Sequence, residues 1–195
     1  MTMEGREKSI CEAGETLLAE RLSKNIIAIE TALQSAPEAY CLGFLAAMQD
    51  LLEQVAEAQK QGDKGSLQYI SVSYLQSSLY TGSYQLRLDA YDERQFGDLT
   101  DTYVYWSPGF IFQHLDSDIV HFRKHIGEHV LRVQEPEIMC FVVRYSMHYY
   151  RIVQQLLTDL LIPMTQTLGI AAEEDLDITF GGYMDEAIAL TEKEE

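Results

Sequence analysis

The side chains best suited to chemistry lie in one stretch of the chain, residues 111–151. It contains all five histidines, namely His114, His121, His125, His129 and His148. It also contains five of the fourteen lysines and arginines, namely Arg123, Lys124, Arg132, Arg144 and Arg151. Neutral imidazole is a common metal ligand, and arginine binds carboxylates and phosphates. The stretch therefore indicates either a metal site or an anion site.

Helical spacing limits what these histidines can do together. A continuous helix over residues 111–132 turns by about 100° per residue, which places His121, His125, His129 and Arg132 in one stripe. Two histidines four residues apart can bind one ion. Three cannot, because His121 and His129 would lie roughly 12 Å apart along the helix axis.

A second helix is predicted to begin near Pro136, after the break at Val133-Gln134-Glu135. It is apolar around most of its circumference, which is typical of a buried helix. Its narrow polar stripe carries Arg144, His148 and Arg151. Antiparallel packing against the preceding helix would bring the two polar stripes together. We therefore predict a pocket that binds a ligand through His121, His125, His129, Arg132, Arg144, His148 and Arg151.

The charge balance favours an anion in this pocket. Residues 121–151 hold five basic and three acidic residues, whereas the whole chain has a net charge of −17. Arginines next to a divalent cation would raise its electrostatic cost. In the alternative hypothesis the protein is a metal-dependent enzyme or a metal-binding protein that uses zinc, iron or manganese. Its ligands would be His121 and His125, or His125 and His129, with His148 and a carboxylate such as Glu128 or Asp118.

A purely structural role for these residues stays open, because no familiar catalytic pattern accompanies them. The sequence has no glycine-rich phosphate loop, G-x-S-x-G, H-E-x-x-H or EF-hand loop. Its acidity argues against nucleic acid and anionic membrane as partners. The leading hypothesis is a non-enzymatic protein that binds a partner protein or a small anionic ligand, as a homodimer. Whether the protein is an enzyme stays open.

Composition indicates a single globular domain, residues 1–195, in a reducing compartment. Its three cysteines include no C-x-x-C pair, so free thiols are expected. The first fifteen residues lack the apolar core of a signal peptide, and the longest apolar run, Ile138–Val143, is far too short to cross a membrane. We expect a cytoplasmic protein with loose acidic ends at about residues 1–5 and 171–195.

The elements that position this stretch are predicted from apolar periodicity. Residues 4–34 and 37–61 have apolar side chains at three- and four-residue steps, which predicts two helices in an antiparallel hairpin. The stretch 111–151 supplies a second helical hairpin. Pro163 should kink or end its second helix, with a continuation to Gly169. A short helix is expected over residues 183–190.

From residue 70 the apolar period changes from 3.6 to two. Residues 70–75 and 84–91 alternate between apolar and polar side chains, which predicts a β-hairpin with one buried face, and residues 103–106 suit a third strand. The predicted fold class is α+β, with four to five helices packed on a small antiparallel β-hairpin sheet. Many tyrosines fall near these strands, where they either line a pocket or reflect ordinary strand preference. They are Tyr69, Tyr74, Tyr80, Tyr84, Tyr91, Tyr103 and Tyr105.

Overall fold

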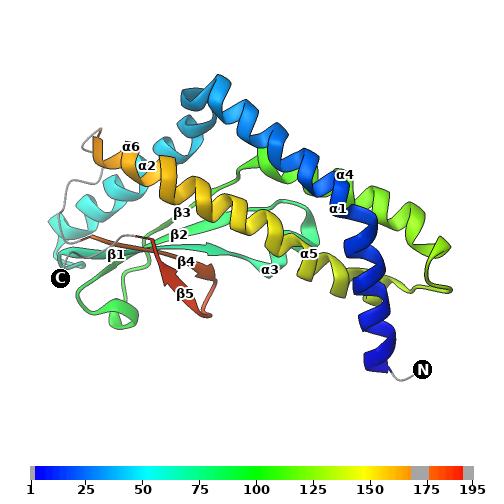
Figure 1. Cartoon of the computed structure of the whole chain (residues 1–195). Helices are drawn as coiled ribbons and strands as arrows, with labels where there is room; N and C mark the ends of the chain where they lie inside the picture. The colour runs from blue at the N-terminus through cyan, green and yellow to red at the C-terminus, as the bar shows by residue number, and fades with distance from the viewer. Residues whose placement is uncertain (1–2, 168–175, 191–195) are drawn as a thin grey trace. The chain divides into compact units, whose positions relative to one another are not determined.

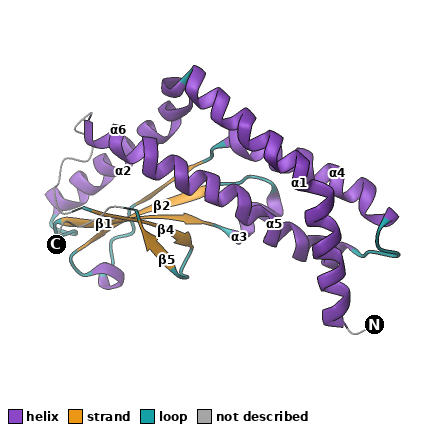
Figure 2. Ribbon diagram, in the orientation of Figure 1, coloured by secondary structure: helices purple, strands orange, loops and turns teal. Residues whose placement is uncertain are grey.

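The computed structural model describes residues 3–167 and 176–190 (Figure 1). It confirms the α+β class, since helices are combined with a five-stranded mixed sheet (Figure 2). The chain divides into two compact units, residues 1–37 with 109–152 and residues 38–108 with 153–195. Each unit is built from two separate stretches of chain. The single domain stays a prediction. Of the loose ends expected at about residues 1–5 and 171–195, residues 1–2, 171–175 and 191–195 lie outside the described residues, whereas residues 3–5 begin a helix and residues 177–182 and 187–189 form strands.

The first unit is helical. It contains α1 (Met3–Ser35), α4 (Gly109–His125), the short 3-10 helix η2 (Ile126–Glu128) and most of α5 (Glu135–Leu156). The predicted continuous helix over residues 111–132 is wrong beyond His125. Two amides, those of residues 129 and 130, both bond to the carbonyl of Ile126, and Arg132 has a left-handed φ of 54°. Gly127, a weak helix former, lies where the helix stops.

The antiparallel hairpin of α4 and α5 is confirmed by its ring contacts. The centroids of Phe122 and Phe141 lie 4.1 Å apart, and those of Phe112 and Tyr150 lie 5.3 Å apart. Residues that come later on α4 therefore meet residues that come earlier on α5. Aromatic rings, rather than the predicted polar stripes, make these contacts between the two helices.

The second unit holds α2 (Pro37–Gln61), the short helix α3 (Gln76–Thr81), the 3-10 helix η1 (Gln95–Gly97) and the sheet. The strands are β1 (Leu67–Tyr74), β2 (Leu86–Asp92), β3 (Tyr103–Trp106), β4 (Asp177–Gly182) and β5 (Ala187–Ala189). Their order across the sheet is β3-β2-β1-β4-β5. Because α1 and α2 belong to different units, the hairpin expected from them stays a prediction.

The predicted strand pair is confirmed, but the simple hairpin sheet is wrong. β1 and β2 are antiparallel, with Ile70 opposite Ala90 and Val72 opposite Leu88, and α3 lies in their connection. The sheet is mixed because β4 adds parallel to β1. The helix expected over residues 183–190 is wrong as well, since a turn and β5 occupy that range. Ile178 and Phe180 are buried, which shows the period-two pattern of a strand.

One face of the sheet is the core of this unit. Ile70, Val72, Leu86 and Leu88 are fully buried on it. Helix α2 supplies a matching apolar face, and its Phe44 packs edge-on against Trp106 of β3 with the ring centroids 5.0 Å apart. The opposite face carries the polar members of each strand.

The end of the long C-terminal helix is irregular, as its proline predicts. α5 is followed by the π-helical segment η3 (Leu157–Leu161) and by α6 (Ile162–Thr167). Pro163 has no amide hydrogen for a bond to the preceding turn, which favours such a local change of winding. The expected continuation to Gly169 falls outside the described residues. No helix in the described ranges is both long and apolar enough to cross a membrane.

Gly14 of α1 gives a direct test of packing in the helical unit. A Cβ at this position would lie 2.6 Å from Cζ of Phe141 and 2.9 Å from Cε2 of Phe122. We expect Gly14→Ala to lower the free energy of unfolding by about 1–3 kcal/mol, because both rings are buried and must move. Denaturant unfolding followed by circular dichroism measures this change.

Gly43 is the matched control, since it is also a helical glycine. Its Cβ would meet only Trp106, at an ordinary 3.6 Å. Gly43→Ala should therefore raise the free energy of unfolding by about 0.5–1 kcal/mol through helix propensity alone. A stabilising effect of Gly14→Ala would contradict the close approach of the three helices at this glycine.

Candidate functional site

Asp118 of α4 lies at the centre of the helical unit and is fully buried. Its carboxylate accepts hydrogen bonds from donors on α1 and α5. They are Arg21 Nε at 2.8 Å, Asn25 Nδ2 at 3.1 Å, Tyr145 OH at 2.8 Å and Tyr149 OH at 2.6 Å. Three of these donors bond to Oδ2 and Arg21 bonds to Oδ1, so the protein engages both oxygens of the carboxylate. This Asp118 cluster joins α1, α4 and α5.

The two phenols of this cluster are held in their protonated form. Burial raises the pKa of Tyr145 and of Tyr149, and the hydrogen bond to the Asp118 carboxylate raises both further. A phenol that stays protonated continues to donate its hydrogen bond across the accessible pH range. The cluster therefore has the properties of a permanent structural element.

Of the histidines that the sequence groups in one stripe, the structure keeps His121 and His125 side by side and places His129 beyond the helix end. The rings of His121 and His125 lie 4.5 Å apart on α4, and Nδ1 of His125 lies 3.1 Å from a carboxylate oxygen of Glu128. His129 and Arg132 are exposed beyond the end of the helix. Over the described ranges, no three His, Cys, Asp or Glu side chains are grouped in a way that could hold a metal ion. The geometry thus gives the metal hypothesis no support.

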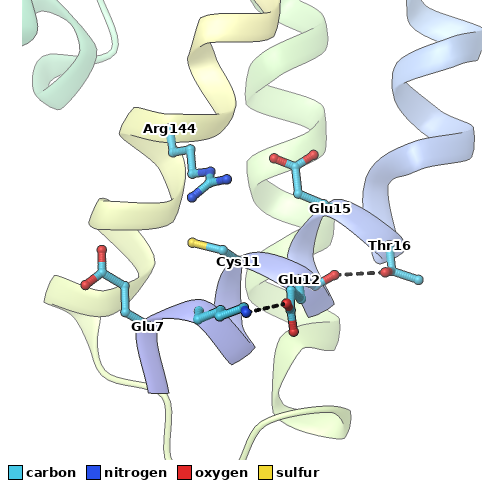
Figure 3. A pocket seen from close by; sticks show the side chains of 7 residues that line it. Glu7, Cys11, Glu12, Glu15, Thr16 and Arg144 are labelled. Atoms are coloured by element: carbon cyan, nitrogen blue, oxygen red, sulfur yellow. Dashed lines mark hydrogen bonds and ion pairs between the residues drawn. The ribbon is translucent and has the colours of Figure 1, made fainter. Parts of the chain in front are cut away.

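The basic residues of α5 meet α1. Nε2 of His148 lies 3.3 Å from a carboxylate oxygen of Glu15, and Arg151 is exposed. Arg144 lines a groove beside the first turns of α1 (Figure 3), and none of the histidines lines it. The predicted convergence of the two polar stripes around one pocket is therefore not what the structure shows.

This Arg144 groove is acidic on balance. Its lining residues are Glu7, Lys8, Cys11, Glu12, Glu15, Thr16 and Arg144. Three carboxylates thus face two cations, and Lys8 is already within 3.8 Å of Glu12. In Figure 3 the guanidinium of Arg144 extends toward the helix that carries Cys11 and Glu15. An anion entering here would meet more negative than positive charge, which disfavours it.

The second unit has a more enclosed site on the polar face of its sheet. Alternate residues of β1 point to this face, and their register partners on β2 and β4 do so too. Tyr69, Ser71 and Ser73 of β1, with Tyr91 of β2 and Thr179 of β4, form its floor. We call this hollow the sheet-face cavity, and its volume is about 200 Å³. Cavities of roughly 150 Å³ bind molecules of the size of benzene.

The rim of the sheet-face cavity comes from two turns. Tyr183, Met184 and Asp185 lie in the turn between β4 and β5, and Gln95 lies in η1. Met184 and Gln95 have left-handed φ angles of 59° and 52°. Such angles are uncommon outside glycine and collect at ligand sites, where surrounding structure holds them. Two of the four non-glycine residues with positive φ in the described chain thus lie on this rim.

An ion pair lies on the same face beside the cavity floor. Asp89 is directly opposite Ser71 in the register, and only 3% of it is exposed. Its Oδ1 accepts a hydrogen bond from Nε of Arg87 at 2.8 Å, and the guanidinium NH2 group of the same arginine forms an ion pair with it at 2.7 Å. Its Oδ2 is buried and has no hydrogen-bond partner among the described residues. Buried polar atoms in native proteins are nearly always paired, so this oxygen is an exception within the described fold, and Asp89 itself does not line the cavity.

Burial is the main cause of the pKa shifts of the acidic groups around this ion pair. Desolvation raises the pKa of Asp89, although Arg87 opposes the shift. Burial also raises the pKa of Tyr91 to about 12, with a further contribution from the charge of Asp89. The Arg87 guanidinium lies 3.8 Å from the ring centroid of Tyr103 and 4.9 Å from that of Tyr183. This arrangement stacks a cation against two tyrosine rings.

The sequence analysis predicted some residues of this site but not their arrangement around a cavity. Tyr69, Tyr91 and Tyr103 belong to the tyrosine cluster that the sequence associates with pockets. Asp89 and Tyr183 were missed as site residues. The sequence pattern that could have indicated this face is Arg87, Asp89 and Tyr91. These residues alternate along a predicted strand, so a basic and an acidic side chain are placed next to each other on its polar side.

We expect Asp118→Asn to destabilise the protein strongly. The substitution removes the charge that Arg21 compensates and turns one acceptor oxygen into a donor facing other donors. Breaking a buried ion pair in this way costs on the order of 3 kcal/mol of unfolding free energy. Denaturant unfolding of Asp118→Asn, compared with exposed Asp116→Asn on the same helix, measures the effect. Equal, small effects of both substitutions would contradict the structural role of the cluster.

His121 should make stability depend on pH in a defined direction. Burial lowers its pKa, and the nearby charges of Arg21 and His125 lower it further. The unfolded chain then binds a proton more readily, so stability falls as the pH drops through the unfolded value of about 6.5. We expect His121→Asn to gain stability relative to the wild type between pH 7.5 and 5, as thermal unfolding would measure. A relative loss over this interval would contradict the lowered pKa.

Comparison with known proteins adds no family to these observations. No protein-family model, curated protein or solved structure matches this chain. A functional conclusion therefore has to come from the geometry of the two units. Of their sites, the sheet-face cavity is less open than the Arg144 groove, and its rim carries two unusual backbone conformations.

Proposed function

We propose that this protein is a non-enzymatic binding protein for a small molecule, and that the ligand occupies the sheet-face cavity. The observation that carries the proposal is the cavity itself, a partly enclosed hollow of about 200 Å³ on the polar face of the sheet. Pockets that bind small molecules combine an apolar body with a few placed polar groups. Here tyrosine rings supply the apolar surface, and Ser71, Ser73 and Thr179 supply hydroxyl groups.

The rigidity of the floor supports the proposal. It is formed by side chains on three adjacent strands, and β1 at its centre is hydrogen-bonded on both sides. Ser73 is buried, and its hydroxyl lies 3.3 Å from that of Ser71. A site on strands of a paired sheet keeps its geometry better than one on loops, which lowers the entropic cost of binding.

The loop that carries Gln95 is also anchored. Lys64 is buried, pairs with Asp98, and donates a hydrogen bond to the carbonyl of Ala90 at 2.8 Å. Arg94 pairs with buried Asp92 at the end of β2. These ion pairs fix the segment on both sides of Gln95. The rim of the cavity is therefore held in place before a ligand arrives, which supports binding rather than a loose surface depression.

A binding role agrees with the arrangement of the polar groups. Among the described residues that line the cavity there is no histidine, cysteine or lysine that would serve as a base or a strong nucleophile. The proposal keeps the small-molecule ligand expected from the sequence and moves its site from residues 121–151 to the sheet. Self-association as a homodimer and a protein partner stay predictions from the helical sequence pattern.

Three matched probes test the proposal: benzyl alcohol, benzylamine and benzoate. Each has a small aromatic body of a size suited to the cavity. We expect at least one to bind with a Kd on the order of 1 mM, a normal value for so few atoms. NMR titration should move the backbone amide signals of β1, of β4 and of residues 183–185. Absence of any such change with all three probes would overturn the proposal.

A substitution that fills the cavity provides the second test. Ser71→Leu places a larger apolar side chain on the floor and should abolish the probe-induced changes while leaving the fold intact. Ser77→Leu is the matched control, because Ser77 is exposed on α3 and does not line the cavity. The two variants should have similar melting temperatures, and only Ser77→Leu should keep wild-type binding. Binding that survives Ser71→Leu would place the probe elsewhere.

A further inference from the structure

The floor of the sheet-face cavity is polar but carries no charge. Its polar side chains are serine, threonine and tyrosine hydroxyls on β1, β2 and β4. Among the described residues that line the cavity, Asp185 is the one with a formal charge, and it is exposed on the rim. Oδ1 of Asp185 accepts a hydrogen bond from the amide of Glu186 at 2.8 Å. The floor therefore offers neutral partners to a ligand.

The ion pair of Arg87 and Asp89 lies on the same face of the sheet, but neither residue lines the cavity. The guanidinium of Arg87 lies 2.7 Å from a carboxylate oxygen of Asp89 and 3.2 Å from one of Asp101. Its positive charge is thus compensated by the protein itself. An anionic ligand would find no lysine, arginine or histidine among the described residues that line the cavity.

A charged ligand would lose water of hydration on this floor without gaining a counter-charge. Ser73 is only 4% exposed, and Ser71 and Tyr91 are half-buried. Removing an ion from water is unfavourable unless an opposite charge compensates for it. Asp185 would repel an anion, and it could attract a cation only at the exposed rim, where salt screens the interaction. The distribution of charge therefore favours an uncharged ligand.

Two hydroxyl residues lie side by side on the floor. Ser71 of β1 and Thr179 of β4 are partners in the parallel register, and neighbouring strands are about 4.8 Å apart. The Ser71 hydroxyl also lies 3.3 Å from that of Ser73, further along β1. A hydroxyl group has one donor hydrogen and two acceptor lone pairs. A hydroxyl on the ligand can likewise donate or accept, so it can pair with these groups in either direction.

Aromatic rings supply the apolar part of the lining. They belong to Tyr69, Tyr91 and Tyr183, and Met184 lies on the rim. Aromatic rings pack against one another in offset or edge-to-face arrangements, and a thioether sulfur also packs favourably against a ring. Burial raises the pKa of Tyr91 to about 12, so its phenol stays neutral at ordinary pH. An aromatic ring on the ligand would thus meet rings that are themselves uncharged.

We propose that the ligand of the sheet-face cavity is an uncharged aromatic compound with a hydroxyl group, which lies beside Ser71 and Thr179. The ring of the ligand packs among Tyr69, Tyr91 and Tyr183. This inference rests on the proposed binding function and adds the chemical class of the ligand. The class differs from the anion expected at the histidines and arginines of residues 121–151.

The decisive comparison uses the unaltered full-length protein and three probes of nearly equal size. Benzyl alcohol is neutral, benzylamine carries a positive charge and benzoate carries a negative one. We expect benzyl alcohol to bind at least about tenfold more tightly than benzoate, and more tightly than benzylamine, in NMR titrations. Its Kd should change little between about 0.05 M and about 0.5 M salt, because salt screens only the interactions of charges.

A variant locates the hydroxyl group of the ligand. Thr179→Val removes one hydroxyl from the floor and keeps a β-branched side chain that suits a strand. It should weaken the binding of benzyl alcohol about threefold to tenfold, the contribution of one neutral hydrogen bond. Thr81→Val is the matched control, because Thr81 is exposed and does not line the cavity, and it should keep wild-type binding. If Thr179→Val does not fold, the order of the three probes on the wild-type protein still decides the question.

The outcomes separate this inference from the proposed function. Tightest binding of benzyl alcohol, weakened in Thr179→Val, supports both. Equal or tighter binding of benzylamine or benzoate in the cavity overturns the uncharged ligand but leaves a small-molecule binding protein. A preference for benzylamine that Asp185→Asn removes would identify a cation held at the rim instead. Unchanged binding of benzyl alcohol in Thr179→Val overturns the position of the hydroxyl group, and failure of all three probes to bind overturns both proposals.

Discussion

The register of β1 determines what each face of the sheet presents. β1 is the central strand, antiparallel to β2 on one side and parallel to β4 on the other. A slip of one residue would exchange Val72 for Ser71 on the buried face, and every neighbouring pair would change with it. Burial of the apolar side chains, at roughly 25 cal/mol per Å², opposes such a slip. The polar face is thus a consequence of the apolar one. The same constraint that forms the core also places Ser71, Asp89 and Thr179 side by side.

A different constraint acts in the helical unit, and it explains why the histidines and arginines of residues 121–151 do not line one common pocket among the described residues. A buried carboxylate must be compensated by donors, and Asp118 obtains them from α1 and α5. Around this cluster, ring contacts and the ion pair of Arg123 with Glu135 also join α4 and α5. Arg144 and His148 then have acidic side chains of α1 as neighbours, so the basic character of residues 121–151 is balanced locally. A positive stretch in the sequence need not become a positive surface.

Local patterns predicted most of the elements, and non-local pairing accounts for most of the errors. The helices over residues 3–35 and 37–61 and the antiparallel pair β1–β2 follow from apolar period and were confirmed. The parallel pairing of β4 joins residues about a hundred positions apart, and its signal is only Ile178 and Phe180. The predicted stripe of histidines was wrong beyond His125, because the helix ends there and Gly127 lies in the 3-10 turn that follows. Tyrosines of the cavity were visible as a cluster. The unpaired oxygen of Asp89 was not, because it depends on which donors surround it.

Asp118 and Asp89 show how the environment assigns opposite roles to the same side chain. Both are buried, and both are paired with an arginine. Asp118 has four donors from three kinds of side chain, so its charge is satisfied within the fold. Asp89 has one oxygen saturated and one unpaired among the described residues, which costs about 1–3 kcal/mol in the absence of a partner. A stable fold can carry such a cost at one position. Asp89 does not line the neighbouring cavity, and its Oδ2 is shielded from solvent, so Arg87 is the partner that the described part of the fold supplies for this charge.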